Sequence, residues 1–301
     1  GGAAARPLRF AIDKDFPDPD VLAVDGGYLL FGTNAGSVNV QVAWSRDLES
    51  WEMRRADALP VLPGWASRGR TWAPEVSVIG GRYVMFFTAE HWPSGRQCVG
   101  VAVASNPEGP YDSPAAKPLV CPLEDGGAID ASVFVDDDNT AYLLYKTDGN
   151  CCGKPTRIEL VRLSADGTAL AGTARELIRQ TQQWEGNLVE APTLLKRDGR
   201  YVLLYSANDY AGAQYAIGYA TAAAVAGPYT KADGPFLSTD GSGLTWLGPG
   251  GQDVAIAPDG TDRMVFHSWD SAVRYRGINV APLSWQDGVP RLAHPGRDPR
   301  P

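Results

Sequence analysis

Carboxylates recur in this chain where apolar strands are expected to begin. They are Asp18 and Asp20, Glu75, Asp130 and Glu190. Two of them are unusual, because Asp130 and Glu190 lie among apolar residues, in AIDASVF and LVEAPTL. A carboxylate in such surroundings must accept hydrogen bonds or have a raised pKa. Side chains of this kind act as general acids and bases, and pairs of them cleave glycosidic bonds.

The sequence supplies little for competing chemistries. It contains three histidines, and it has no GxSxG elbow, P-loop, HExxH motif or dinucleotide-binding glycine pattern. Nucleophilic triads and hydride transfer are therefore disfavoured. Five tryptophans lie in or near loops that flank the expected strands: Trp72, Trp92, Trp184, Trp246 and Trp269. Their faces could stack on sugar rings, although packing between strands would account for several of them.

Repeated hairpins must position the carboxylates. Five segments share alternating apolar residues, a turn and a second apolar strand: PDPDVLAVDGGYLLFG, APEVSVIGGRYVMFF, IDASVFVDDDNTAYLLY, EAPTLLKRDGRYVLLY and GQDVAIAPDGTDRMVFH. Their anchors at positions 18, 74, 130, 190 and 252 are 56, 56, 60 and 62 residues apart, and each unit has a second, outer half. This period predicts an all-β fold, a five-bladed β-propeller with four-stranded antiparallel blades around a central channel.

We expect a single domain over residues 1–301. A pair of β-sandwiches is the alternative, but it does not explain why one hairpin motif occurs five times. In a propeller the innermost strand of each blade lines the channel. The residues that begin these strands should therefore converge on one pocket at its mouth.

Charge and composition limit the partners. The chain has 27 basic and 35 acidic residues, a net charge of −8, which argues against nucleic acid or an anionic membrane surface. No apolar run reaches the roughly 18 residues of a membrane helix. We expect a monomer that binds neither nucleic acid nor membranes.

The four cysteines fit an oxidising compartment, so we expect secretion. Cys98 and Cys121 are close enough in sequence to close one loop with a disulfide. Cys151 and Cys152 are adjacent, and the sequence leaves open whether they are two thiols or one vicinal bridge. None of the four forms a CxxC motif or a cluster with histidine, so a zinc site is not expected.

The motifs PDPDV, SRDLESW, WAPEV, AIDASVF, VEAPTLL and FHSWD resemble those of glycoside hydrolase family 43 from Asp18 to Trp285. This family contains five-bladed α-L-arabinofuranosidases, arabinanases and β-xylosidases. By resemblance, Asp18 is the general base and Glu190 the general acid, while Asp130 modulates the pKa of the acid and orients it.

Three further residues are expected to bind substrate: Trp72, Arg276 and His267. Arg276 resembles an arginine that binds the sugar in the cleavage subsite. His267 resembles a channel histidine that in arabinanase-type members supports calcium or a water cluster, so calcium held mostly through water is a further expectation. Those members often have a second histidine in a GPGH stretch, where this chain reads GPGGQD.

The resemblance implies an inverting enzyme that releases terminal α-L-arabinofuranosyl residues from arabinan or arabinoxylan oligosaccharides of plant cell walls. Endo-1,5-α-L-arabinanase, β-D-xylosidase and galactofuranosidase activities use the same scaffold and remain alternatives. A propeller lectin is the non-enzymatic alternative, but lectins repeat one binding residue in every blade, whereas these blade starts differ. A sucrose- or fructan-active propeller would carry an Asn-Asp-Pro-Asn stretch that is absent here.

Overall fold

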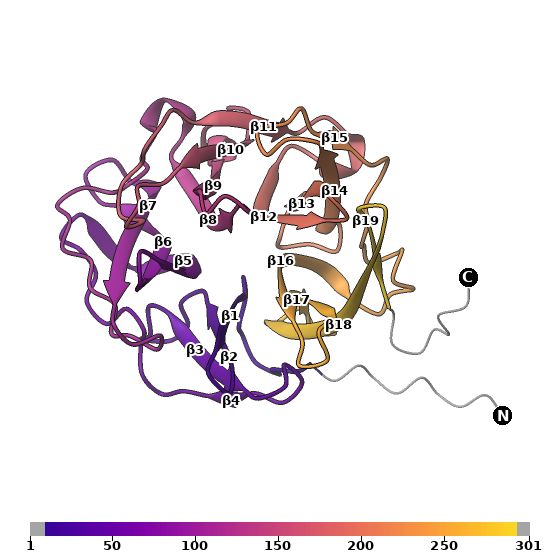
Figure 1. Ribbon diagram of the computed structural model, residues 1–301, viewed down its shortest axis with the longest axis horizontal. Coiled ribbons are helices and arrows are strands. Elements are labelled where there is room, and N and C mark those ends of the chain that lie inside the picture. The colour runs from indigo at the N-terminus through magenta and orange to yellow at the C-terminus, as the bar shows by residue number, and fades with distance from the viewer. Residues whose placement is uncertain (1–9, 294–301) are drawn as a thin grey trace.

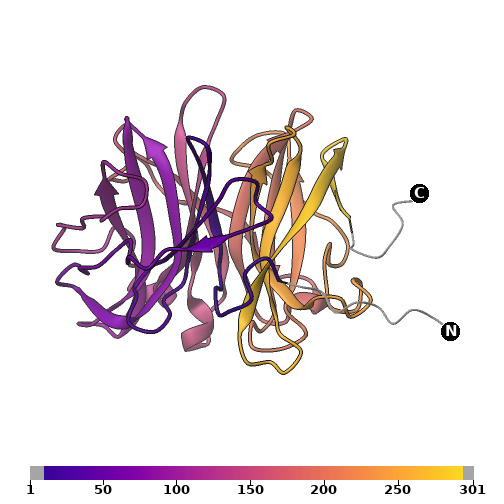
Figure 2. The same ribbon diagram turned by 90° about the horizontal axis from the view of Figure 1, so that it is seen from below.

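The computed structural model describes residues 10–293, which form five antiparallel sheets around a central axis (Figure 1). Figure 2 shows the sheets side-on, with their strands running roughly along this axis. The five-bladed propeller is therefore confirmed and the two-sandwich alternative is wrong. Residues 1–9 and 294–301 of the expected domain lie outside the described part.

Each blade is one sheet whose strands follow chain order from the axis outward (Figure 1). Blades 1 and 2 comprise β1 (Asp20–Val24), β2 (Gly27–Gly32), β3 (Gln41–Ser45), β4 (Glu52–Met53), β5 (Ala66–Ile79), β6 (Arg82–His91) and β7 (Arg96–Ala104). Blades 3 and 4 comprise β8 (Ala128–Val135), β9 (Ala141–Thr147), β10 (Arg157–Arg162), β11 (Arg175–Arg179), β12 (Val189–Arg197), β13 (Arg200–Ala207), β14 (Ala216–Ala222) and β15 (Thr230–Lys231). Blade 5 comprises β16 (Leu247–Ile256), β17 (Asp262–Trp269), β18 (Arg276–Gln286) and β19 (Val289–Leu292).

The described residues also contain three short 3-10 helices: η1 (Leu123–Asp125), η2 (Gly149–Cys152) and η3 (Gln183–Glu185). Within the described range there is accordingly no helix long and apolar enough to cross a membrane.

Blade 2 departs from the expected four strands. Its sheet has three named strands, and the following segment makes only isolated bridges, Val103 with Asp112 and Val99 with Val120. Between these bridges lie Pro114 and Pro118. Proline has no N–H to donate to a ladder, which explains why this edge is interrupted.

Apolar clusters fill the interfaces between neighbouring blades. Leu29 and Phe31 of blade 1, for example, pack in one cluster with Val76 and Phe87 of blade 2. Equivalent clusters join the other neighbours, so most of the hydrophobic burial holds blade against blade. This packing fixes the innermost strands relative to one another.

The N-terminal segment closes the ring by pairing with the last blade. Ala11 N–H donates to Ile278 O, Ile278 N–H donates to Ile12 O, and Phe16 N–H donates to Arg276 O. Ile12 and Phe16 are buried in the cluster between blades 1 and 5. Residues close to Asp18 are thus anchored to the blade that carries Arg276.

One residue per blade adopts a left-handed backbone conformation in the innermost strand or directly before it. The five, with φ values of 58°, 44°, 59°, 51° and 60°, are Asp18, Ala73, Asp130, Ala191 and Gly251. In blades 2 to 5 they fall within irregularities of the inner ladder. Such bulges bend a strand and redirect its side chains. Two of the left-handed residues are the candidate carboxylates Asp18 and Asp130, and a third, Ala191, directly follows Glu190.

The N–H group of each left-handed residue donates to a side chain of the preceding blade. The acceptors, in the order of the five donors, are His267, Thr33, Thr88, Asp130 and Ser206. A left-handed conformation in a residue other than glycine costs about 1–3 kcal/mol. The hydrogen bonds between blades help to hold this conformation, so the arrangement of the site depends on closure of the ring.

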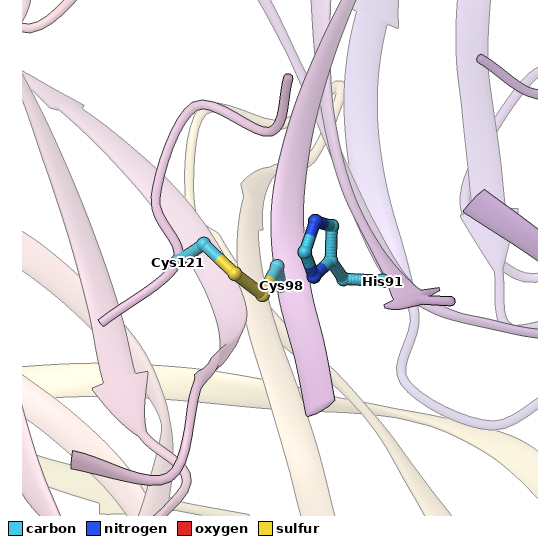
Figure 3. Close-up of side chains that lie close together, drawn as sticks. All are labelled: His91, Cys98 and Cys121. Carbon is cyan, nitrogen blue, oxygen red and sulfur yellow. A yellow bond between two sulfur atoms is a disulfide. The ribbon is translucent and has the colours of Figure 1, made fainter. Parts of the chain in front are cut away.

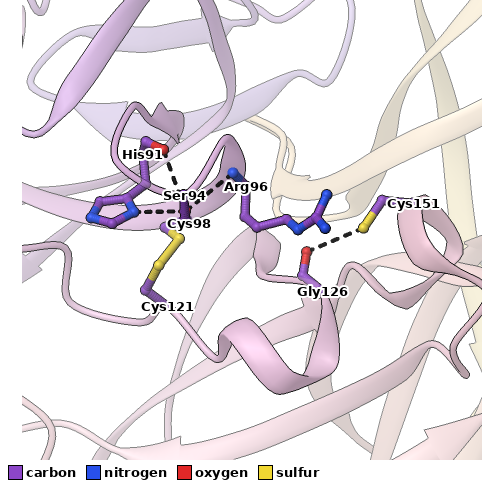
Figure 4. The surroundings of a disulfide bond; sticks show 7 residues. All are labelled: His91, Ser94, Arg96, Cys98, Cys121, Gly126 and Cys151. Atoms are coloured by element: carbon purple, nitrogen blue, oxygen red, sulfur yellow. Dashed lines mark hydrogen bonds between the residues drawn. A yellow bond between two sulfur atoms is a disulfide. The ribbon is translucent and has the colours of Figure 1, made fainter.

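Cys98 and Cys121 lie at disulfide-bonding distance, with 2.00 Å between the sulfur atoms. His91 lies beside them (Figure 3), but the two sulfurs are bonded to each other, so this trio does not form a metal site. His91 instead contacts Ser94, with 2.7 Å between Nδ1 and Oγ. The sulfurs of Cys151 and Cys152 are also at bonding distance, at 1.90 Å, and Cys151 Sγ lies 3.5 Å from Gly126 O (Figure 4).

Non-reducing peptide mapping of protein purified without reductant should recover Cys98 linked to Cys121. Replacing both by serine should lower the free energy of unfolding by about 3 kcal/mol, because the bond closes a loop of roughly 24 residues in the unfolded chain. Denaturant unfolding of the double variant measures this loss. Free thiols at both positions in the folded protein would contradict the assignment.

Candidate active site

Three candidate carboxylates meet in one pocket at the mouth of the channel. A cavity of about 440 Å³ is lined by Asp18 of blade 1, Asp130 of blade 3 and Glu190 of blade 4. Trp72 and Arg276 line the same cavity. The structure thus brings together five of the six residues to which the sequence assigned catalysis or sugar binding, although they are far apart along the chain.

Asp18 is partly accessible in the pocket. Its side chain is 23% exposed. Thr33 Oγ1 donates to its Oδ2 over 2.6 Å, and its backbone N–H donates to His267 Nδ1 over 3.0 Å. The Thr33 hydroxyl fixes the direction of the carboxylate, whose Oδ1 lies 3.7 Å from His267 Nδ1.

Asp130 is held between the other two carboxylates. Its Oδ2 accepts a hydrogen bond from the N–H of Ala191 over 2.9 Å. Burial raises the pKa of Asp130 well above its ordinary value, and the nearby charges of Glu190 and Asp18 raise it further. Because Ala191 directly follows Glu190, this hydrogen bond positions the backbone that carries Glu190.

Both oxygens of Glu190 have partners. Lys146 Nζ donates to Oε1 over 2.7 Å and Tyr215 OH donates to Oε2 over 2.7 Å. Lys146 is 1% exposed and also pairs with Asp148 at 3.2 Å. A carboxylate that forms on Glu190 after it has given up a proton is therefore stabilised by a buried ammonium and a phenol hydroxyl.

Replacing Lys146 by methionine should destabilise the fold by about 3 kcal/mol, the low end of the range for a buried ion pair, because it leaves the partly buried carboxyl groups of Glu190 and Asp148 without their cation. Guanidinium unfolding checks this expectation. Lys196→Met is the matched control, since Lys196 pairs with the exposed carboxylate of Asp137 at the surface and should have little effect. Equal losses in the two variants would contradict the role given to Lys146.

His267 supports Asp18 from behind the pocket. It is completely buried, stacks on Tyr215 with ring centroids 6.0 Å apart, and is not among the residues that line the cavity. His267 therefore does not reach the cavity in which the sequence predicted it to bind substrate, and its contact with the site is the hydrogen bond that it accepts from the Asp18 N–H. Gly251 makes room for it, because a Cβ atom at that position would lie 2.5 Å from His267 Cε1. This contact explains why the chain has glycine at this position.

The tautomer of His267 does not fit a directly bound calcium ion. Burial, with a smaller contribution from Arg276, lowers the pKa of His267 well below its ordinary value, so the ring is neutral. Its Nδ1 accepts the Asp18 N–H, which places the ring hydrogen on Nε2. Nε2 has no hydrogen-bond partner among the described residues, and an N–H group donates to an oxygen rather than to a cation.

Aromatic side chains form part of the pocket wall. The Arg276 guanidinium lies 4.8 Å from the centroid of Tyr210 and 5.6 Å from that of Trp269. On Trp72 the guanidinium of Arg70 lies 5.1 Å from the ring centroid. Among the five tryptophans considered from sequence, Trp72 lines this cavity and Trp269 contacts Arg276. Trp184 and Trp246 pack within the protein, and Trp92 is exposed at the surface.

Sequence reasoning missed three residues of the site: Lys146, Tyr215 and Tyr210. Lys146 pairs with Ile129 in the ladder of blade 3, and the same ladder position holds Thr88, Ser206 and His267 in blades 2, 4 and 5. At the corresponding place in blade 1 the Thr33 N–H donates to Pro17 O. An alignment of the second strands of the five repeats would have shown that Lys146 is the one lysine or arginine at this position. Tyr215 and Tyr210 lie in an irregular connection, and nothing in the repeat marks them.

The site combines carboxyl groups on separate blades that face one pocket with an aromatic wall. It has the elements that hydrolysis of a glycosidic bond requires. A five-bladed propeller with this site defines a carboxylate-dependent glycoside hydrolase.

Comparison with known proteins agrees with this class. The family model of glycosyl hydrolases family 43 matches residues 11–290. The chain belongs to glycoside hydrolase family 43. A solved thermostable family-43 glycoside hydrolase is 31% identical, with a TM-score of 0.83 and 96% of each chain covered. An endo-1,4-β-xylanase from Bacteroides thetaiotaomicron is 28% identical, with a TM-score of 0.80 and coverage of 95% of this chain and 96% of that one.

The curated relatives differ in the sugar that their names specify. A β-D-galactofuranosidase of Aspergillus niger is 27% identical over 84% of this chain and 73% of its own length. An extracellular endo-α-(1→5)-L-arabinanase of Bacillus subtilis is 22% identical over 91% of this chain and 86% of its own length. An arabinoxylan arabinofuranohydrolase of Bacillus subtilis is 32% identical over 59% of this chain, which spans 36% of that relative. Family membership therefore establishes a glycosidase and leaves the sugar open.

Proposed function

We propose that this enzyme releases terminal α-L-arabinofuranosyl residues from arabinan or arabinoxylan oligosaccharides with inversion at the anomeric carbon. The observation that carries the proposal is the convergence of Asp18 and Glu190, from blades 1 and 4, on one pocket of about 440 Å³. That volume is in the range of small-ligand sites and suits a terminal sugar. Relatives named for arabinan and arabinoxylan support the choice of sugar.

In the proposed reaction Glu190 protonates the glycosidic oxygen while the bond from this oxygen to the anomeric carbon breaks. A water molecule attacks that carbon from the opposite face and transfers a proton to Asp18. An inverting mechanism needs roughly 6.5–9.5 Å between the two carboxyl groups to accommodate this water. Lys146 and Tyr215 stabilise the carboxylate that forms on Glu190, and Asp130 keeps Glu190 in place through Ala191.

Arg276 and Trp72 would bind the sugar ring and its hydroxyl groups at the wall of the pocket. Secretion is part of the proposal, supported by arabinanase relatives that are named extracellular. That the enzyme acts as a monomer is a further part of the proposal.

Hydrolysis of a panel of 4-nitrophenyl glycosides, together with chromatography of products from arabinan and arabinoxylan, tests the sugar and the mode of attack. We expect activity on the α-L-arabinofuranoside and release of free arabinose from the start of the reaction. A series of oligosaccharides as first products would instead indicate an endo-arabinanase. Preference for the β-D-galactofuranoside would favour the second candidate activity, which the Aspergillus niger relative supports.

A further inference from the structure

In every blade the residue that follows the left-handed residue lines one small cavity, of about 40 Å³, to which all five blades contribute. Four of these residues have no hydrogen-bonding side chain: Pro19, Pro74, Ala131 and Pro192. In blade 5 the residue is Gln252, which is 4% exposed. A buried amide requires hydrogen-bond partners, and a departure from a repeated pattern is expected where function demands it. Gln252 is therefore a candidate for a specific role in the site.

The amide of Gln252 reaches the backbone next to Glu190. Its Nε2 donates to the carbonyl oxygen of Ala191 over 2.6 Å, from blade 5 to blade 4. The N–H of Ala191 donates to Asp130 Oδ2 of blade 3 over 2.9 Å. Both peptide groups of Ala191, the one shared with Glu190 and the one shared with Pro192, are thus held by side chains of the neighbouring blades.

The segment after Glu190 depends on these contacts because the strand ladder does not hold it. Glu190 has a ladder partner, but the next two residues, Ala191 and Pro192, have none in the register of β12 with β13. Ala191 has a φ of 51°, which is unfavourable in a residue other than glycine. Proline has no N–H to donate to a ladder. The direction in which the strand leaves Glu190 is therefore set by the contacts made to Ala191.

The hydrogen bonds around Gln252 determine which end of its amide faces Ala191. A carbonyl oxygen only accepts hydrogen bonds, so the amide nitrogen must face it. Ser206 Oγ accepts the N–H of Gly251 over 3.0 Å and donates to Gln252 Oε1 over 2.8 Å. Thr193 Oγ1 donates to the backbone oxygen of Gln252 over 2.8 Å. The side chain is therefore held at both Oε1 and Nε2 and has one orientation.

We propose that Gln252 is a positioning residue for the general acid: by holding the Ala191 carbonyl, it keeps the Glu190 carboxyl directed at the glycosidic oxygen. Lys146 and Tyr215 contact the carboxyl group itself, whereas Gln252 acts on the backbone that carries it. A small displacement of a proton donor lowers the rate strongly, because proton transfer requires a short and aligned contact. The inference rests on the role of Glu190 as general acid in the proposed function.

Gln252→Met tests the inference, because methionine has a similar volume and cannot donate to the Ala191 carbonyl. The kcat for an arabino-oligosaccharide should fall about 10–100-fold, whereas the kcat for a dinitrophenyl arabinofuranoside, which needs little protonation, should fall less than about threefold. The KM for either substrate should change little, since Gln252 does not line the substrate cavity. Steady-state kinetics give the ratio of the two kcat values, which is the readout.

Asn39→Leu is the matched control. Asn39 is also buried, at 3% exposed, and its Nδ2 donates to the backbone oxygen of Leu59 in blade 1 over 2.7 Å. Both variants should melt at a lower temperature than the wild-type protein, but Asn39→Leu should leave the ratio of the kcat values unchanged. Equal losses on the two substrates in folded Gln252→Met would show a merely structural role and overturn the inference.

A double-mutant cycle tests whether Gln252 acts through Glu190. In the Glu190→Gln background, Gln252→Met should cause little further loss on the oligosaccharide, because the proton donor is already absent. Losses that multiply independently would contradict action through Glu190. If the loss in Glu190→Gln itself does not depend on the leaving group, the general acid of the proposed function is wrong, and the role of Gln252 is overturned with it.

Ser206→Ala decides the question if Gln252→Met does not fold. This variant removes the hydroxyl that holds Oε1 and leaves Gln252 in place, so it should lower the ratio of the kcat values severalfold in the same direction. An unchanged ratio in Ser206→Ala would then overturn the inference.

Discussion

Glu190→Gln should lower turnover of natural arabinosides by about 10²–10⁴-fold, because an amide cannot donate the proton that the leaving oxygen requires. The glutamine can keep hydrogen-bonding contact with Lys146 and Tyr215, so its position should change little. Substrates with very good leaving groups need little protonation and should lose much less activity. Steady-state kinetics on an arabino-oligosaccharide and on a dinitrophenyl arabinofuranoside measure this difference.

The matched control is Glu176→Gln. Glu176 lies on the outer strand β11 of blade 3, where it pairs with Arg179 at the surface, and this variant should behave as the wild type on both substrates. Equal losses on good and poor leaving groups in Glu190→Gln would count against its role as the general acid.

Asp18→Ala should also reduce turnover by about 10²–10⁴-fold, because the attacking water loses its base. Added azide should restore activity, since the anion enters the vacated space and attacks without having to give up a proton. The product should be a glycosyl azide of inverted configuration, which NMR can identify.

Asp25→Ala is the control for this experiment, because Asp25 is an exposed residue in the turn between β1 and β2. It should retain full activity and gain nothing from azide. If the Asp18→Ala protein is folded but inactive and azide does not restore its activity, Asp18 acts in substrate binding rather than in activation of water.

The architecture could be predicted because its signals are local. Alternating apolar residues, a turn and a regular spacing mark each hairpin, and the carboxylates at Asp130 and Glu190 precede strands that are visible in sequence. The fourth strand of blade 2 is missing for an equally local reason, Pro114 and Pro118. Because both prolines are visible in the sequence, the interrupted edge of blade 2 could also have been predicted.

Other features depend on contacts that no spacing encodes. Lys146 reaches Glu190 across the interface between two blades, 44 residues away, and Tyr215 reaches the same carboxylate from a loop. The left-handed backbone conformation could not be predicted either, because three residue types, aspartate, alanine and glycine, adopt it at equivalent positions of the blades. The role of His267 follows from which of its nitrogens accepts the Asp18 N–H, and only the assembled ring determines that.

The anomeric configuration of the first product tests the central claim most directly, namely that water activated by Asp18 displaces the leaving group that Glu190 protonates. Proton NMR recorded within the first minutes of hydrolysis, before the released sugar equilibrates, distinguishes the two anomers. From an α-L-arabinofuranoside the account predicts the β-anomer as the first product. Initial appearance of the α-anomer would mean retention through a covalent intermediate and would contradict direct attack by water.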